Sequence, residues 1–250
     1  EYDGPQGLTL ADTAGKNWLS DVCGYPAAPV MAATWNAPLM YEFGHAVGQE
    51  ALAADIDGWY APALNILRSP FCGRSSEYYS EDPLLCGLLG AQVVSGAGDA
   101  GLSCAVKHFA LMLTEAHKNP NTCIWMTEQA LREIYLRPFE IAVKTARKTI
   151  LYAQDDQADT LLSRTMRAAD FVMASDSAIG GEWCAANYAL LTQVLRGEWG
   201  FEGCVVSDMH NAVTAPILEK MLRAGCDTLM STNSGNTDIL SRPASATTLH

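Results

Sequence analysis

Short apolar runs alternate with amphipathic helical patterns along most of this 250-residue chain, which predicts an α/β protein with a mainly parallel sheet. About five or six of these runs have the length and composition of strands. Three of them end in polar side chains, at Lys107-His108, Ser175-Asp176 and Ser207-Asp208. Because the strands fall short of a closed eight-stranded barrel, we expect a TIM-barrel-like (β/α)8 architecture that is truncated or irregular.

The first half of the chain carries two clear helix starts. Asn36 is expected to cap a helix with Pro38 in its first turn. Acidic residues before Pro83 mark a second helix, which should break at the glycine-rich segment 96–101. The expected elements, in chain order, are loop with short helical pieces at 1–28, a buried strand at 29–33, a helix from Asn36 to 57–58, extended pieces at 59–62 and 65–68, a helix from 80 to 96, and a strand at 103–106.

The second half begins with a helical pattern at 127–144, which Pro138 should kink or divide. The pattern weakens over 145–167, where several aspartates indicate an exposed insertion. The later elements are a strand at 171–175, a helix capped by Asn187, a strand at 204–206, a helix at 215–224 and a strand at 226–230. We therefore expect one barrel domain over 1–230 with an insertion near 145–167, and a linker or disordered tail over 231–250.

Composition favours a neutral ligand. The formal net charge is −12 and the basic residues are scattered, so neither nucleic acid nor an anionic membrane is expected as a partner. No run approaches the roughly 18 apolar residues of a membrane span. The chain opens inside a turn and without an initiator Met, so the lack of a signal-peptide pattern at its start does not decide whether a targeting segment lies upstream. The eight cysteines contain no Cys-x-x-Cys pair and are interpreted as reduced, mostly buried thiols, which favours a cytoplasmic location.

The polar groups at the strand ends are expected to share one pocket. In a barrel, the carboxyl ends of all strands face the same side, so Asp208, Lys107, His108 and Arg68 should line one mouth. Each of them also has a purely structural alternative, such as a helix cap. The set suits a neutral sugar, because hydroxyls need charged donors and acceptors, and an ionised Asp can attack an anomeric carbon. His210 is interpreted as a loop histidine.

Several other chemistries have no motif in the chain. There is no glycine-rich phosphate loop, no Gly-x-Ser-x-Gly elbow and no histidine-rich metal spacing. We therefore expect no cofactor and no metal.

The run from Val194 to Asn211 carries a family resemblance. It contains two aliphatic residues, a base, an acidic position, Gly203, three apolar positions and then Ser207-Asp208. This pattern resembles the nucleophile signature of glycoside hydrolase family 3, the family of retaining β-glucosidases and β-xylosidases. Further segments similar to the family occur in the same order at 2–5, 65–74, 77–83, 107–110 and 128–140.

The resemblance implies a retaining exo-acting glycosidase that hydrolyses terminal β-D-glucosyl or β-xylosyl residues through a covalent intermediate on Asp208. It implies that Asp3, Arg68, Lys107 and His108 hold the hydroxyls of the sugar in the first subsite. It also implies that a second α/β sandwich domain outside this chain completes the pocket and, in many members, supplies the general acid/base. The substrate would be a β-glucoside or an oligosaccharide.

The chain departs from the family pattern at several sugar contacts. The departures are Met112 and Lys118 where Asn and Arg are usual, Asp176-Ser177 where Tyr-Asn or Phe-Asn is usual, and Met209 where Trp is usual. A histidine loop that supplies the acid in N-acetylglucosaminidases is also missing, which argues against hexosaminidase activity.

A second catalytic carboxyl group is not evident in the sequence. Retaining glycosidases need two, about 5 to 5.5 Å apart. The candidates can also be interpreted as caps, ion-pair partners or loop groups; they are Glu77, Glu81, Glu115 and Asp176. Two alternatives therefore stay open: a catalytically impaired sugar-binding or structural barrel that lacks its acid/base partner domain, and an incomplete fragment with no function of its own.

Overall fold

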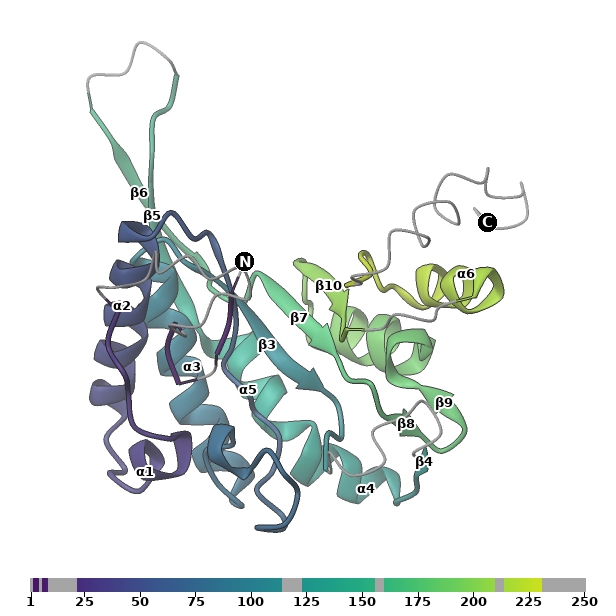
Figure 1. The fold of residues 1–250 in the computed structure, drawn as a ribbon. Coiled ribbons are helices and arrows are strands. Elements are labelled where there is room, and N and C mark those ends of the chain that lie inside the picture. The colour runs from purple at the N-terminus through teal and green to yellow at the C-terminus, as the bar shows by residue number, and fades with distance from the viewer. Residues whose placement is uncertain are drawn as a thin grey trace, which may run out of the picture.

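A five-stranded parallel sheet organises the protein (Figure 1). The computed structural model describes residues 2–4, 6–8, 22–113, 123–155, 160–209 and 214–230, and for Tyr2, Asp3 and Ala215 it describes the backbone alone. In spatial order the strands are β1 (Tyr2–Asp3), β2 (Gly58–Tyr60), β3 (Ser103–Phe109), β7 (Phe171–Ala174) and β10 (Cys204–Ser207).

The central strands are buried on both faces. Cys104, Val106, Val172 and Val205 are fully buried, as expected for parallel strands between a helix layer and a barrel interior. Val206 also forms a parallel bridge with Thr228, so the expected strand at 226–230 is present as an isolated bridge and not as a regular strand. The strands and helices alternate in the pattern of a TIM-barrel-like (β/α)8 fold, of which the described residues form an open part.

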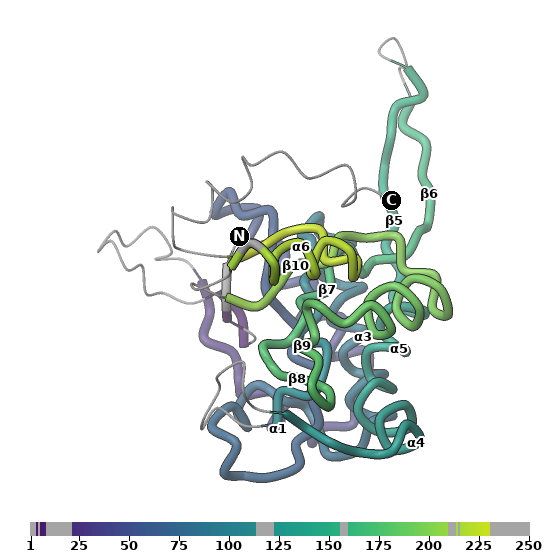
Figure 2. The backbone as a smooth tube through the Cα atoms, turned by 90° about the vertical axis from the view of Figure 1, so that its right-hand side faces the viewer, coloured from purple at the N-terminus to yellow at the C-terminus, as the bar shows by residue number. Residues whose placement is uncertain are grey.

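The helices cover the outside of the sheet. Along the chain they are α1 (Ala28–Ala32), α2 (Ala37–Ala53), η1 (Ser75–Glu77), α3 (Pro83–Asp99), α4 (Glu128–Ala130), η2 (Leu131–Tyr135), α5 (Arg137–Thr145), η3 (Cys184–Ala186), η4 (Ala189–Glu198) and α6 (Ala215–Ala224). Helices α2, α3 and α5 lie side by side along one flank, and α6 lies at the other end of the sheet (Figures 1 and 2). None of the helices in the described ranges combines the length and the apolar run that a membrane crossing requires.

Local side-chain chemistry explains the helix starts. The Asn36 side chain accepts a hydrogen bond from Leu39 N, and Asp82 Oδ1 accepts from Leu84 N and Leu85 N, so both predicted caps are confirmed. Asn187 likewise accepts from Leu190 N at the start of η4. The pattern at 127–144 is divided before Pro138, as predicted.

One prediction of local structure is wrong. Residues 29–33 begin with a proline that suits the first turn of a helix, and they form most of α1 rather than a strand. Helix α3 ends at Asp99, within the segment 96–101 where the break was predicted. Its first glycine, Gly96, lies where the helix touches α2: an added Cβ would lie 2.0 Å from Tyr41 O. Residues 65–68, predicted as an extended piece, have no regular secondary structure, and Ala63 just before them forms isolated parallel bridges with Tyr78 and Lys107.

Residues 145–167 form an exposed projection, as expected, but with regular structure that was not predicted. The strands β5 (Arg147–Tyr152) and β6 (Leu162–Arg167) pair antiparallel and extend away from the body in both views (Figures 1 and 2). A second small sheet lies beyond the carboxyl ends of the main sheet and contains β4 (Cys123–Ile124), β8 (Ala178–Ile179) and β9 (Glu182–Trp183). The tail at 231–250 lies outside the described residues.

The cysteines are thiols and form no disulfide within the described residues. Those buried in the structure are Cys72, Cys86, Cys104, Cys184 and Cys226, while Cys204 is half-buried. Cys23 and Cys123 are exposed. The prediction that most of the cysteines are buried is therefore confirmed.

Candidate active site

Polar groups gather where three neighbouring strands end. Phe109 of β3 pairs with Ala174 of β7, and Ala174 pairs with Ser207 of β10. The backbone pairing continues one residue further, because Ser175 N donates to Phe109 O at 2.6 Å and Asp208 N donates to Ala174 O at 2.9 Å. The three polar pairs predicted at strand ends therefore meet at one edge. Asp3 lies at the carboxyl end of β1, on the same edge of the sheet.

Asp208 presents a buried carboxylate at this edge. The residue is only 6% exposed, and its Oδ1 accepts a hydrogen bond from Met209 N at 2.7 Å. Its Oδ2 is buried and accepts no hydrogen bond from the described residues. A buried carboxylate oxygen without a partner is costly, so such an atom calls for a functional explanation. The strand end below it is fixed by Ser207, whose N donates to Thr228 O and whose Oγ accepts from Met230 N.

Lys107 lies 1% exposed at the end of β3 and contacts a buried carboxylate. Its Nζ is 3.9 Å from Oε2 of Glu77, and Oε1 of Glu77 accepts from Nε of Arg74. Glu77 is thus an ion-pair partner for two cations, which is one of the structural alternatives that the sequence left open. Burying an unpaired charge is costly, and Glu77 supplies the ion-pair partner of the buried Lys107 side chain.

His108 is held by Asn65, a residue that the sequence patterns did not single out. The backbone N of His108 donates to Asn65 Oδ1 at 2.8 Å, and the backbone carbonyl oxygen of His108 accepts from Asn65 Nδ2 at 2.8 Å. The imidazole Nδ1 is 3.2 Å from the same Oδ1. Both residues are almost fully buried. The sequence indicated only an extended piece at 65–68. The contact itself joins residues 43 positions apart, and it forms because the chain segments that carry them pair with each other.

Asp176 and Cys184 are two further buried ionisable residues, and both come after β7 in the chain. Asp176 is 7% exposed and follows Ser175, whose Oγ accepts from Ser177 N. Burial, partly offset by a hydrogen bond to Ala110 O, raises the pKa of Cys184 to about 12, and Asp176 adds a smaller upward contribution. The Cys184 thiol therefore stays protonated near neutral pH and is unsuited to act as a nucleophile.

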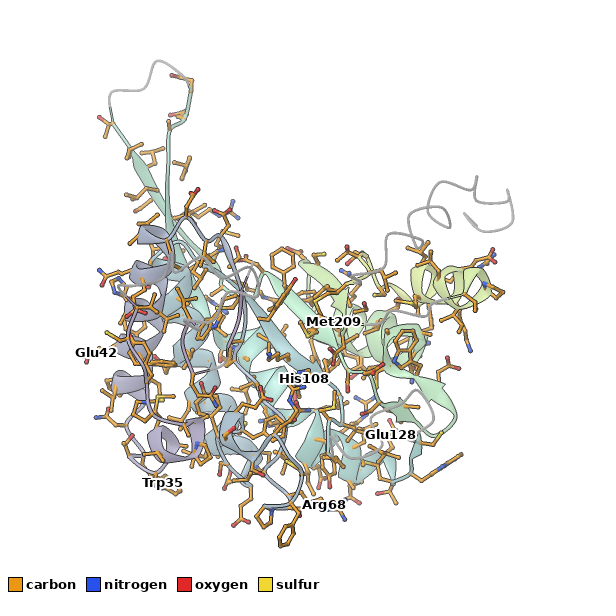
Figure 3. All side chains as sticks on the ribbon, viewed as in Figure 1. Trp35, Glu42, Arg68, His108, Glu128 and Met209 are labelled. Carbon is orange, nitrogen blue, oxygen red and sulfur yellow. The ribbon has the colours of Figure 1, made fainter. Side chains whose placement is uncertain are left out.

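The other predicted residues are more exposed than this buried group, or they lie outside the described residues. Arg68 is exposed and lies at the lower edge of the molecule, whereas His108 lies near the centre of the sheet (Figure 3). Met209 is 51% exposed next to Asp208. Glu81 is also exposed. The positions that lie outside the described residues are Glu115, Lys118 and His210, and of Asp3 only the backbone is described.

Two further features limit the chemistry of the described part of the chain. Its residues contain no group of three or more His, Cys, Asp or Glu side chains placed to hold a metal ion. A hollow of about 260 Å³ is lined by residues at the strand starts, such as Gly58, Ser103 and Phe171, and by Val206, Thr228 and Met230 beside β10. Neither Lys107, His108 nor Asp208 is among its lining residues.

Comparison with known families agrees with this geometry. The family described as "Glycosyl hydrolase family 3 N terminal domain" matches residues 13–246. The chain belongs to this family. The match covers the strand ends that carry Lys107, His108 and Asp208, so the resemblance seen in the sequence is confirmed at the level of the family.

Family 3 β-glucosidases are among the similar proteins. Beta-glucosidase A of Butyrivibrio fibrisolvens is 38% identical over 82% of this chain, which covers 22% of that protein. Thermostable beta-glucosidase B of Acetivibrio thermocellus is 36% identical over 94% of the chain and is covered to 28%. The structure of beta-glucosidase 3B from Thermotoga neapolitana in complex with glucose superposes with a TM-score of 0.75 at 35% identity, covering 92% of this chain and 29% of that one. The chain thus spans about a quarter of the length of these relatives.

Proposed function

We propose that this chain forms the barrel of a retaining, exo-acting β-glucosidase that removes terminal β-D-glucosyl or β-xylosyl residues, with Asp208 as the nucleophile. The observation that carries the proposal is the Asp208 carboxylate. It is buried at the carboxyl end of β10, and its Oδ2 accepts no hydrogen bond from the described residues. The β-glucosidase names of the family 3 relatives support the choice of sugar.

The chemistry follows from a carboxylate held beside cationic and neutral donors. Asp208 attacks the anomeric carbon while the bond to the leaving oxygen breaks and a general acid protonates that oxygen. The product is a glycosyl ester on Asp208. Water, deprotonated by the same acid/base group, then attacks the anomeric carbon and releases the carboxylate. Two inversions leave the sugar with its original β configuration.

The remaining site residues serve to bind the sugar. Lys107 and His108, fixed by Glu77 and Asn65, are proposed to hold hydroxyls of the non-reducing sugar, together with Asp3 and Arg68. Charge-assisted hydrogen bonds from such groups are roughly twice as strong as neutral ones and fix one ring orientation. Strand β7 lies between β3, which carries Lys107 and His108, and β10, which leads into Asp208.

The general acid/base is proposed to come from outside this chain. The chain spans only 22 to 28% of the family relatives named above, which leaves room for a further domain. Of the candidate carboxylates in the described ranges, Glu77 is engaged by two cations and Glu81 is exposed. Asp176 is buried beside Cys184. We therefore propose that an adjoining α/β sandwich domain supplies the acid.

Covalent trapping tests the proposed function. The whole protein is incubated with a 2-deoxy-2-fluoro-β-glucoside that carries an activated leaving group, and the labelled peptide is mapped by mass spectrometry. We expect one label, on Asp208. Asp170→Asn is the matched control, because Asp170 pairs with Lys148 at the other end of the sheet and its loss should leave labelling intact. Labelling of another residue, or none in an active protein, rules out Asp208 as the nucleophile.

A second candidate function is a sugar-binding barrel that no longer turns over. The observation in its favour is Met112, which is buried with Ala63, Cys72 and Tyr78 at a position where the resemblance implies a polar sugar contact. Calorimetry with gluco-oligosaccharides separates the candidates, since saturable binding without release of glucose favours the binding barrel.

A further inference from the structure

The Asn65 side chain pairs with His108 as a strand backbone would. The amide of Asn65 accepts from His108 N and donates to His108 O, both at 2.8 Å. Next to it, Leu64 N donates to Lys107 O at 2.6 Å, and Lys107 N donates to Pro62 O at 3.0 Å. The segment after β2 therefore runs along the end of β3, and the Asn65 side chain extends the pairing by one residue.

This pairing leaves no choice in the orientation of the amide. A backbone N–H can only donate and a carbonyl oxygen can only accept, so the atom facing His108 N must be Oδ1 and the atom facing His108 O must be Nδ2. Exchanging the two atoms would oppose two donors and two acceptors at 2.8 Å. The ambiguity that usually attends an Asn side chain is absent here.

The same oxygen determines which nitrogen of a neutral His108 imidazole carries the proton. Nδ1 of His108 lies 3.2 Å from Asn65 Oδ1. An amide oxygen has lone pairs and no proton, so the contact is a hydrogen bond only if Nδ1 carries the proton. A neutral imidazole has one N–H, which makes Nε2 its acceptor nitrogen.

We propose that Asn65 is a positioning residue that fixes His108 as its Nδ1–H tautomer at the sugar subsite. In this form His108 accepts a hydrogen bond from a sugar hydroxyl through Nε2. The adjacent Lys107 ammonium can only donate. The pair thus offers one donor and one acceptor at the end of the same strand, so a hydroxyl beside Lys107 accepts a hydrogen bond and a hydroxyl beside His108 donates one. This inference rests on the proposed role of His108 in sugar binding.

The test combines spectroscopy with kinetics on the whole protein. Histidine nitrogens are labelled with ¹⁵N and observed at about pH 8, where an unperturbed imidazole is neutral. The His108 signals are assigned by their loss in His108→Gln. Wild type is compared with Asn65→Ala, which removes all three contacts, and with Asn65→Asp, which keeps an acceptor for Nδ1–H. The control is Asn36→Ala, which removes a helix cap far along the chain from the site.

The proposal predicts a protonated Nδ1 in wild type and in Asn65→Asp, and a shift toward the Nε2–H form in Asn65→Ala. The kcat/KM of Asn65→Ala on aryl β-glucosides should fall about 10- to 100-fold, whereas Asn36→Ala should lower thermal stability without changing kcat/KM. An Nε2–H tautomer in wild type overturns the proposal, as does unchanged kcat/KM in Asn65→Ala.

Failure of the two hypotheses can be told apart. If the wild-type protein hydrolyses no glycoside, the proposed function fails, while the ¹⁵N spectrum still decides whether Asn65 sets the tautomer. If Asn65→Ala does not fold, the wild-type tautomer and the activity of Asn65→Asp decide the outcome, because that variant retains the acceptor oxygen.

Discussion

Buried ionisable groups at the strand ends are the main feature at the scale of single residues. Lys107, Glu77 and Asp208 are each less than 9% exposed. Burying a charge is costly unless it is paired, so residues of this kind are retained for function more readily than for stability. Lys107 has Glu77 beside it, and Glu77 has Arg74.

Glu77→Gln tests this dependence. The change leaves Lys107 and Arg74 without their carboxylate, and we expect a loss of about 3 kcal/mol in folding free energy, as for other broken buried pairs. The kcat/KM for β-glucosides should fall as well, because Lys107 loses its anchor. Thermal unfolding and steady-state kinetics measure the two effects.

Glu128→Gln is the matched control for this experiment. Glu128 pairs with Arg132, but its side chain is 75% exposed, so its loss should change stability by less than about 1 kcal/mol. Equal effects of the two substitutions would show that the buried pair contributes no more than a surface pair.

At the scale of elements, the close contact between α2 and α3 depends on glycines, which have no side chain to separate the two helices. An added Cβ at Gly44 would lie 2.2 Å from Val93 O, and one at Gly96 would lie 2.0 Å from Tyr41 O. Glycine normally weakens a helix interior by roughly 0.5–1 kcal/mol relative to Ala. Here it permits two helix backbones to touch, which gives Gly96 a packing role although the helix ends three residues later at Asp99.

Gly96→Ala should therefore destabilise the protein despite its better helix propensity. We expect a net loss of about 1 to 3 kcal/mol, since the backbones of α2 and α3 must separate. Gly181→Ala is the control, because a Cβ there meets nothing within 4 Å. Thermal midpoints measure both variants, and a Gly96→Ala protein that is as stable as wild type would contradict the observed helix packing.

The β5–β6 hairpin is attached to the body only near its base. Thr149 N donates to Asp99 Oδ1 at 2.6 Å, Lys148 Nζ donates to Asp170 Oδ2 at 2.6 Å, and Arg167 bonds to Trp199 O at 3.1 Å. Further out, Leu151 and Leu162 are 67% and 41% exposed. The outer half thus adds little buried apolar area to the core.

Replacing residues 151–163 with a short turn should leave the barrel intact. We expect the thermal midpoint and the kcat/KM to change little, because the contacts at the base remain and the Asp208 edge lies at the other ends of the strands. Lys148→Ala, which removes an ion pair at the base, is the contrasting variant and should lower the thermal midpoint more. A larger loss of thermal midpoint in the shortened variant than in Lys148→Ala would show that the outer hairpin packs on a part of the protein outside the described residues.

Strand-end chemistry was predictable from the sequence, and the contacts behind it were not. Lys107, Ser175 and Asp208 follow apolar runs, and the parallel-sheet rule alone places such residues on one edge. By contrast, the short run at 29–33 fits a buried strand or a helix equally well, and only packing decides. To predict the Asn65–His108 contact, one must know how the segment after β2 aligns with β3. A local sequence pattern gives no information about this alignment.

At the scale of the whole molecule, the described residues form an open part of a family 3 barrel. Five parallel strands and the bridge at Thr228 bring one edge of polar groups together. The chain spans 22 to 28% of its β-glucosidase relatives. We therefore assign the nucleophile and the sugar-binding groups to this chain, as proposals, and the acid/base to a neighbouring domain.

Chemical rescue of Asp208→Gly in the whole protein tests this central claim most directly. Without the nucleophile, hydrolysis of an activated aryl β-glucoside should fall by at least about 10³-fold. Azide should enter the space of the lost carboxylate, attack the anomeric carbon from that side and restore turnover, with α-glucosyl azide as the product identified by NMR. Absence of rescue in a folded protein, or formation of the β-azide, would contradict the assignment of Asp208.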